Sequence, residues 1–235
     1  MSNAPSVVSR LLHTLERLSL PVVTAESCTG GALASALTGR PGAPGLCLGG
    51  VTSYSPLFKR AVLGVPASMI RPGGPGEVSA ECARAMARGV LERSGLLDRH
   101  SHEFKYGDVA KEARGIGLST TGFLDQLPDG EPTARRGEVW IGCYCMFKDH
   151  EGTRIERLNV DGVHAPPPHE QHCVDQADAD RHERKETVVA RALEIVLEVA
   201  QELEQSGKAP SLTKVDKENE TVHAEKEAQS LTGSA

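Results

Sequence analysis

The chain has 235 residues, of which 39% are hydrophobic and 25% are charged, and its formal net charge is −6. This length and balance suit a soluble globular protein of one or two domains. The charges are spread along the chain without a basic block, which argues against a nucleic-acid surface. No apolar run approaches the ~18 residues of a membrane span, and the N-terminal stretch lacks the apolar core of a signal peptide. We therefore expect a cytoplasmic protein with neither a nucleic-acid nor a membrane partner.

The first half of the chain alternates short apolar runs with helical patterns. Helical spacing of apolar residues predicts helices over 6–18, 29–39, 56–65 and 79–95, with a further short helical turn over 66–70. We expect Ser6 and Ser79 to cap the first and last of these helices, and Gly39 and Gly64 to end the middle two. Short apolar runs predict buried strands over 20–25, 46–54 and 115–122.

The second half adds a hairpin and a long helix. The alternating stretch 138–147 and the stretch 153–162 predict an antiparallel hairpin around a turn at 148–152, and 180–205 predicts an amphipathic helix. The fold class expected is a three-layer α/β/α sandwich with a mixed sheet and a late antiparallel hairpin. We expect one domain over 5–205 with an insertion at 95–114, followed by a disordered polar tail over 206–235.

Six cysteines occur without any C-x-x-C pair, which predicts free thiols. Cys143 and Cys145 share one side of a predicted strand, so core packing is the expected role for them. A His- and Pro-rich stretch holds His164, His169, His172 and Cys173. Zinc uses such ligands, but their spacing matches no standard zinc site, and we expect no metal.

The stretch "TAESCTGG", Thr24–Gly31, places small polar residues between a predicted strand and a predicted helix. Such a turn suits a nucleophile, an anion cradle or a helix cap. Glu26 in this turn either orients a lysine or caps the helix, and the residues alone do not choose between the two.

Three pieces of sequence stand in order in the first half: "AESCTGG" at 25–31, "GGVTSYSPLFKRAVLGV" at 49–65 and "EVSAECARAMARG" at 77–89. Their order, spacing and wording resemble the CinA C-terminal family, the nicotinamide-nucleotide amidohydrolases, over about residues 6–204. The resemblance implies hydrolysis of the carboxamide of nicotinamide mononucleotide to nicotinate mononucleotide and ammonia, without a cofactor. It places the nucleophile at Ser27, the base at Lys59 and an assisting hydroxyl at Tyr54.

Elementary chemistry agrees with this set of residues. A serine hydroxyl needs a base to take its proton, and Ser-Lys pairs are a known variant of the triad arrangement. Backbone N–H groups over Cys28, Thr29, Gly30 and Gly31, at a helix start, are expected to hold an oxyanion or a phosphate. The alternative nucleophile is the Cys28 thiol, but no histidine follows in a suggestive setting, and a packed small residue is the expected role.

The sequence departs from the family pattern at the predicted substrate pocket. Thr121 and Gly122 begin the family's T-G-I-A-G-P-x-G-G loop, but "FLDQLPDGEP" then replaces its Ala-Gly-Pro portion. Glu77 stands where the family usually has Ala. Asp180-Arg181 matches a G-D-R helix start without its Gly, so Arg181 is expected to meet a substrate phosphate at a helix N-terminus.

These departures leave two other functions open. The fold could serve as a nucleotide-binding or assembly module without turnover, or it could hydrolyse a different carboxamide. Family members commonly pair, which implies a homo-oligomer. Longer members carry an extra N-terminal domain, whose activity we expect this chain to lack. Either way, the expected partner is a small nucleotide.

Overall fold

The computed structural model describes residues 6–97, 113–148, 150–164 and 176–207. Most of the predicted insertion at 95–114, most of the His-rich stretch and the tail from residue 208 therefore lie outside the described residues. The elements in chain order are α1 Val7–Leu18, β1 Val22–Glu26, α2 Ala32–Thr38, β2 Cys47–Thr52, α3 Pro56–Leu63, α4 Ala67–Ile70, α5 Ala80–Arg93, β3 Ala113–Gly122, the 3-10 turn η1 Thr133–Arg135, β4 Glu138–Phe147, β5 His150–Asn159 and α6 Gln176–Ser206.

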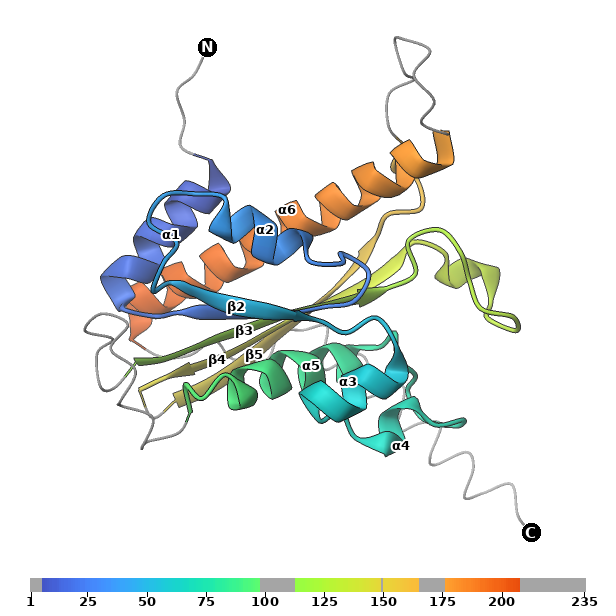
Figure 1. The fold of residues 1–235 in the computed structure, drawn as a ribbon, viewed down its shortest axis with the longest axis horizontal. Helices are drawn as coiled ribbons and strands as arrows, with labels where there is room; N and C mark the ends of the chain where they lie inside the picture. Colours follow the sequence, from blue (N-terminus) through green and yellow to red (C-terminus); the bar gives the residue numbers. More distant parts are fainter. Residues whose placement is uncertain (1–5, 98–112, 149, 165–175, 208–235) are drawn as a thin grey trace.

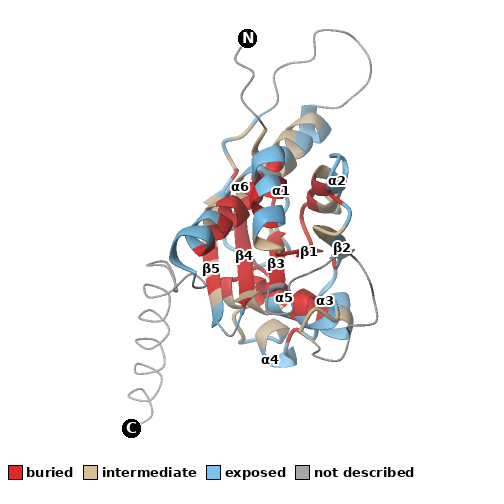
Figure 2. Ribbon diagram, turned by 90° about the vertical axis from the view of Figure 1, so that its left-hand side faces the viewer, coloured by how far each residue is buried: buried red, intermediate tan, exposed pale blue. Residues whose placement is uncertain are grey.

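The centre of the fold is a five-stranded sheet in the order β2-β1-β3-β4-β5. Strand β1 runs parallel to β2 and to β3, and the β3-β4-β5 part is antiparallel. Helices α1, α2 and α6 cover one face, while α3, α4 and α5 cover the other (Figure 1). Turned by 90°, the view shows buried residues concentrated along the sheet and on the helix sides that face it (Figure 2). The predicted three-layer α/β/α sandwich is confirmed.

Local signals place the helix ends. The Ser6 and Ser79 side chains accept hydrogen bonds from the backbone N–H groups of Ser9 and Cys82, at 3.2 and 3.1 Å, and so cap α1 and α5 as predicted. Helix α3 ends at Gly64, whose φ of 69° lies in the left-handed region that glycine tolerates. These caps confirm that short-range chemistry sets where the chain enters and leaves its helices.

Several features differ from the prediction. Strand β4 is buried on both faces, rather than alternating, because α6 covers one side of it and α5 covers the other. Phe147 pairs with His150, so the hairpin turn is shorter than the predicted span 148–152, and Lys148 takes a φ of 54° there. Helix α6 reaches back to Gln176, and β3 begins at Ala113, inside the predicted insertion.

Helix α5 packs very close to the middle of the sheet. A Cβ atom on Gly117 of β3 would stand 1.9 Å from the backbone oxygen of Ala87 in α5. Both residues are fully buried in this layer, so neither element has room to retreat without opening the core.

We expect Gly117→Ala to lower the free energy of unfolding by about 1–3 kcal/mol, because the added methyl group overpacks this contact. Gly162→Ala is the matched control, since a Cβ on Gly162 meets no atom within 4 Å. Urea unfolding of both variants measures the effect. Equal midpoints for the two would show that α5 can shift away from the sheet.

Candidate active site

Glu26, the last residue of β1, is 1% exposed, and its carboxylate organises the turn that follows. Both carboxylate oxygens accept hydrogen bonds, and the donors belong to the strand, the turn and the first residues of α2. They are Thr24 Oγ1 at 3.3 Å, Thr29 Oγ1 at 2.8 Å, and the backbone N–H groups of Gly31, Leu33 and Ala34 at 2.9, 3.0 and 2.9 Å. Of the two roles left open by the sequence, Glu26 therefore caps the helix.

This cap uses much of the expected anion cradle. The Gly31 N–H donates to Glu26, and the Gly30 N–H donates to the Ser27 carbonyl oxygen at 3.2 Å. Within the described parts of the chain, the N–H groups of Cys28 and Thr29 donate to no other residue. Of the four N–H groups expected to hold an oxyanion, those of Cys28 and Thr29 thus remain available. Glycine is needed at Gly30 for conformation, since its φ is 65°.

Ser27 is 6% exposed and sits at the carboxyl end of the sheet. Its backbone N–H donates to the Thr120 carbonyl oxygen of β3 at 2.9 Å. Thr29 and Thr120 also share a hydrogen bond between their hydroxyl groups at 2.8 Å. The predicted nucleophile is therefore fixed in place by the neighbouring parallel strand.

Lys59 of α3 is 1% exposed, which is unusual for a lysine. Its ammonium donates to the Glu77 carbonyl oxygen at 3.0 Å and to Thr121 Oγ1 at 2.9 Å. The Glu77 carboxylate lies 3.8 Å from the same nitrogen. Across the described residues no hydrogen bond joins Lys59 Nζ to Ser27 Oγ; the two catalytic candidates are connected through Thr120 and Thr121, which are consecutive in β3.

The charge of Lys59 also acts on the thiol of Cys28, the residue after Ser27. Burial raises the pKa of Cys28 to about 11, although the Lys59 charge acts to lower it. Burial raises the pKa of Cys82 in α5 to about 11 as well, against the same Lys59 charge. A thiol with such a pKa is almost wholly protonated at neutral pH, so Cys28 is a poor nucleophile.

Tyr54 lies at the outer edge of the site. Its side chain is 66% exposed, and its hydroxyl accepts a hydrogen bond of 3.5 Å from Arg181. Arg181 also binds Asp125. Burial acts to raise the pKa of Asp125, but the hydrogen bonds from Arg181 and from the Gln126 N–H, together with the charges of Arg181 and Arg184, outweigh it, and the net pKa lies below its usual value. Tyr54 thus contacts α6 through Arg181, close to the loop after β3. Among the described residues it makes no hydrogen bond to Ser27 or Lys59.

The expectation that Arg181 stands at a helix N-terminus is wrong. Helix α6 already begins at Gln176, so Arg181 lies in its second turn and reaches the site through its side chain. Asp180, its predicted companion, faces elsewhere and contacts His164 and Gln176 at 2.8 and 2.7 Å.

The segment that follows β3 folds back on its neighbours. A Cβ on Gly122 would stand 2.6 Å from Val139 Cγ2, so this glycine is required for packing against β4. Arg184 of α6 is 3% exposed and donates to the carbonyl oxygens of Leu124 and Val163, both at 3.0 Å. Sequence reasoning missed Arg184, because nothing in a charged helix start distinguishes a buried arginine from a solvated one.

Glu77 is the other residue whose role was missed, although its departure from the family pattern was visible. Its carbonyl oxygen accepts from both Lys59 and Thr121, the latter at 2.7 Å. Any residue at this position offers that carbonyl. The carboxylate beside the Lys59 amine is specific to Glu77, and the family's usual Ala would lack it.

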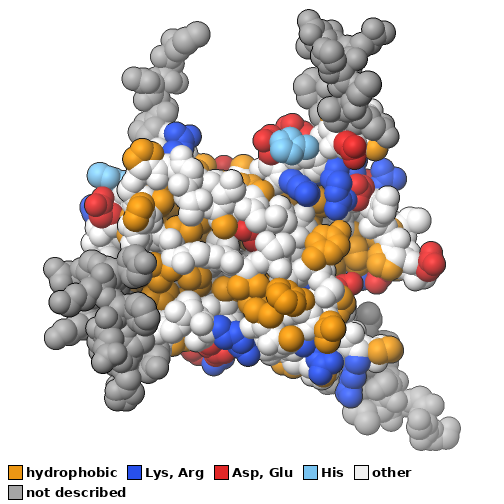
Figure 3. Space-filling model, viewed as in Figure 1, with side chains coloured by type: hydrophobic (Ala, Val, Ile, Leu, Met, Phe, Trp, Pro, Cys, Tyr) orange, Lys and Arg blue, Asp and Glu red, His pale blue; other side chains and the backbone are white. Residues whose placement is uncertain are grey.

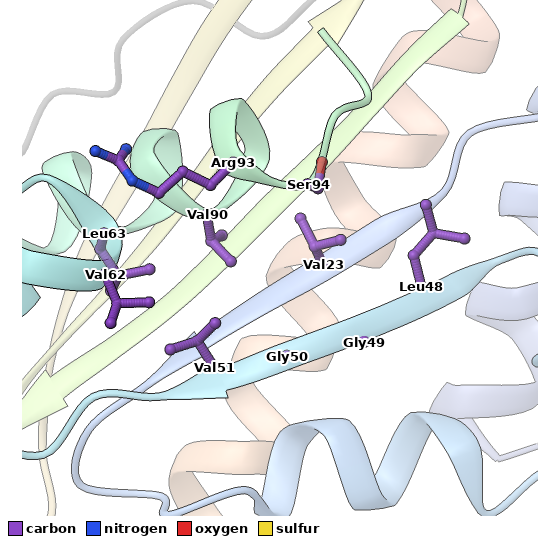
Figure 4. A pocket seen from close by; sticks show the side chains of 10 residues that line it. All are labelled: Val23, Leu48, Gly49, Gly50, Val51, Val62, Leu63, Val90, Arg93 and Ser94. Carbon is purple, nitrogen blue, oxygen red and sulfur yellow. The ribbon is translucent and has the colours of Figure 1, made fainter. Parts of the chain in front are cut away.

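A separate cavity of about 180 Å³ opens between the sheet and helices α3 and α5 (Figure 4). Valine and leucine side chains from β1, β2, α3 and α5 line it, together with Arg93 and Ser94. It contains none of the residues around Ser27, so it does not form part of the candidate site.

Other chemistry-bearing groups are accounted for by packing. Cys143 and Cys145 are free, fully buried and part of the core, as predicted. Searching the described residues finds no group of three or more His, Cys, Asp or Glu side chains arranged to hold a metal. His169, His172 and Cys173 lie outside them.

Comparison with known proteins follows the motifs. Residues 5–96 match the family model described as the CinA C-terminal domain, which confirms the resemblance for this part of the chain. A "CinA-like protein" of Gemmatimonas aurantiaca is 40% identical over 123 residues, covering 52% of this chain and 24% of that protein. One of Chlorobaculum tepidum is 41% identical over 125 residues, covering 53% and 28%. The chain thus spans about a quarter of the length of these curated relatives.

Solved structures support the architecture. A competence-damaged protein (CinA) superfamily protein from Klebsiella pneumoniae aligns with a TM-score of 0.58 at 23% identity, over 83% of this chain and 96% of that one. The competence/damage inducible protein CihA from Agrobacterium tumefaciens gives 0.58 at 24%, over 84% and 98%. At these identities the likeness shows the fold.

We expect Glu26→Gln to lower the free energy of unfolding by about 1–3 kcal/mol, since an amide nitrogen would face donors that need an acceptor. Glu16→Gln on the exposed side of α1 is the control and is expected to change it by less than about 0.5 kcal/mol. Thermal and urea unfolding measure both. If Glu26→Gln behaves like the control, the carboxylate does not hold the turn.

Proposed function

We propose that the protein is an amidohydrolase that cleaves the carboxamide of nicotinamide mononucleotide to nicotinate mononucleotide and ammonia. The observation that carries this proposal is the joint anchoring of two buried residues on β3. Ser27 is held by Thr120 and Lys59 by the next residue, Thr121. A buried serine and a buried lysine, anchored on consecutive residues of β3 at the carboxyl end of parallel strands, have the composition that acyl transfer requires.

In the proposed reaction, Lys59 serves as the base that accepts the Ser27 hydroxyl proton while Ser27 Oγ attacks the carboxamide carbon. The N–H groups of Cys28 and Thr29, which donate to no other described residue, are the proposed donors to the oxyanion that forms. The Lys59 ammonium then gives its proton to the departing nitrogen, and ammonia leaves an acyl-enzyme. Water hydrolyses that ester to the acid and restores Ser27. Tyr54, beside Arg181, assists at the outer part of the substrate.

The scheme uses no cofactor, and the partner is a small nucleotide. Within the described residues, none of the helices has the length and apolar character needed to cross a bilayer. A cytoplasmic location and a homo-oligomeric state remain part of the proposal. The proposed contact between subunits would use large exposed apolar side chains, which among the described residues are Leu48, Tyr54, Leu57 and Phe58.

A second candidate function rests on the segment after Gly122. Its sequence differs from the family's pocket loop, and the structure ties it to β4 and α6. A module that binds a nucleotide without turnover, or an amidase for another carboxamide, would be consistent with that change.

Ammonia release by the purified protein tests the proposal. We expect Ser27→Ala to reduce release from nicotinamide mononucleotide to background. Lys59→Met is expected to lower kcat by about 10²–10⁴-fold, because it removes the general base. The matched control is Cys28→Ala, which we expect to stay within a few fold of wild type, since the Cys28 pKa of about 11 leaves its thiol protonated.

The rival functions give different results. No ammonia from the wild-type protein, with nicotinamide mononucleotide or with a panel of small carboxamides, would contradict amidase chemistry. Thermal stabilisation by the mononucleotide without ammonia would favour the binding module. Release from another carboxamide alone would keep the chemistry and change the substrate. Equal rates for wild type and Ser27→Ala would place the nucleophile elsewhere.

A further inference from the structure

Lys185 of α6 lies over the turn that carries Ser27, and sequence reasoning did not single it out. Its Nζ stands 3.9 Å from the point that a Cβ on Gly30 would occupy. Gly30 is exposed and has no side chain, so the ammonium lies at contact distance from the place where a side chain would begin. No other described lysine lies at this turn; Lys59 is bound beneath it, and Lys148 is in the β4–β5 hairpin.

Its neighbours on the helix are already occupied. Arg184 donates to backbone carbonyl oxygens, and Arg181 binds Asp125. Within the residues that the structure describes, Lys185 makes no hydrogen bond or ion pair. The closest carboxylate in the turn, that of Glu26, is buried and saturated by its own donors. Among the described residues, Lys185 is thus a cation without a paired carboxylate, and it lies over the turn at Gly30.

Arg181 and Lys185 are separated by one helical turn, so their side chains project from the same side of α6. Arg181 reaches the Tyr54 hydroxyl at 3.5 Å, and Lys185 reaches Gly30. Basic side chains gather near the N-terminal end of α6 in the space-filling view (Figure 3). The two cations therefore lie on one side of α6, one beside Tyr54 and the other over the turn at Gly30.

We propose that Lys185 binds the phosphate monoester of the substrate. On the proposed function, this makes Lys185 the residue that selects a mononucleotide over the corresponding nucleoside. An unpaired ammonium is suited to a phosphate, which is a compact anion with several acceptor oxygens.

Calorimetric binding of nicotinate mononucleotide and of its riboside, the same molecule without phosphate, tests this inference independently of turnover. We expect Lys185→Gln to weaken the binding of the mononucleotide by about 10- to 100-fold and to leave the affinity for the riboside unchanged. Lys185→Arg should keep most of the affinity. Inorganic phosphate should compete with the mononucleotide on the wild type and fail to do so on Lys185→Gln.

Lys148→Asn is the matched control, because it removes one positive charge far along the chain and asparagine tolerates the left-handed conformation found there. Equal loss of mononucleotide and riboside in Lys185→Gln, or no loss of either, would overturn the inference. Lys185-dependent binding without ammonia release would support it while contradicting the proposed amidase. Ammonia release with an unchanged preference for phosphate in Lys185→Gln would support the amidase and overturn the inference.

Discussion

The carboxylate of Glu26 is the constraint on which the site depends. A charged group at 1% exposure is tolerated only when donors surround it, and here they come from β1, the turn and the start of α2. Satisfying it fixes the direction in which α2 leaves the sheet. It also fixes the five-residue turn from Ser27 to Gly31, since Thr29 and Gly31 are both held by the same oxygen. Ser27 is thus presented by a rigid loop whose own N–H groups are largely committed.

The second constraint is the pairing of β1 with β3. Glu26 is in register with Thr120, so the strand that supplies the carboxylate lies beside the one that anchors Ser27 and Lys59. Successive strand residues point to opposite faces, and Thr120 and Thr121 accordingly serve the two layers: Thr120 contacts Thr29, while Thr121 contacts Lys59. A register slip of one residue would exchange these faces and separate Ser27 from the lysine. The pair of threonines explains how α3, on one side of the sheet, contributes to a turn that leads to α2 on the other.

Most of the fold follows from local patterns, whereas parts of the site do not. Apolar periodicity and serine caps predict α1 to within one residue and α5 to within two, because those signals act over a few positions. The two-sided burial of β4 was missed, since layers added on both faces are a property of the whole sheet. Burial of Lys59 and Arg184 was missed for a similar reason. The acceptors that make burial affordable, Thr121 and the Leu124 carbonyl, are 62 and 60 residues away along the chain.

The two ends of helix α6 make different kinds of contact. Its C-terminal half packs apolar residues such as Leu193 and Val196 against α1 and the sheet, which anchors the helix. Its first turns make polar contacts: Arg184 donates to the Leu124 carbonyl oxygen, and Arg181 binds Asp125, so the segment after β3 is bound to this helix at two successive residues. That segment is the part of the sequence that departs from the family's pocket loop. Lys185 lies on the same helix, over Gly30. Helix α6 therefore both binds the segment after β3 and holds a positive charge over the turn that carries Ser27. On the proposed function, substrate selection is therefore governed by how α6 and this loop fit together, while the Ser27 turn itself stays fixed by Glu26.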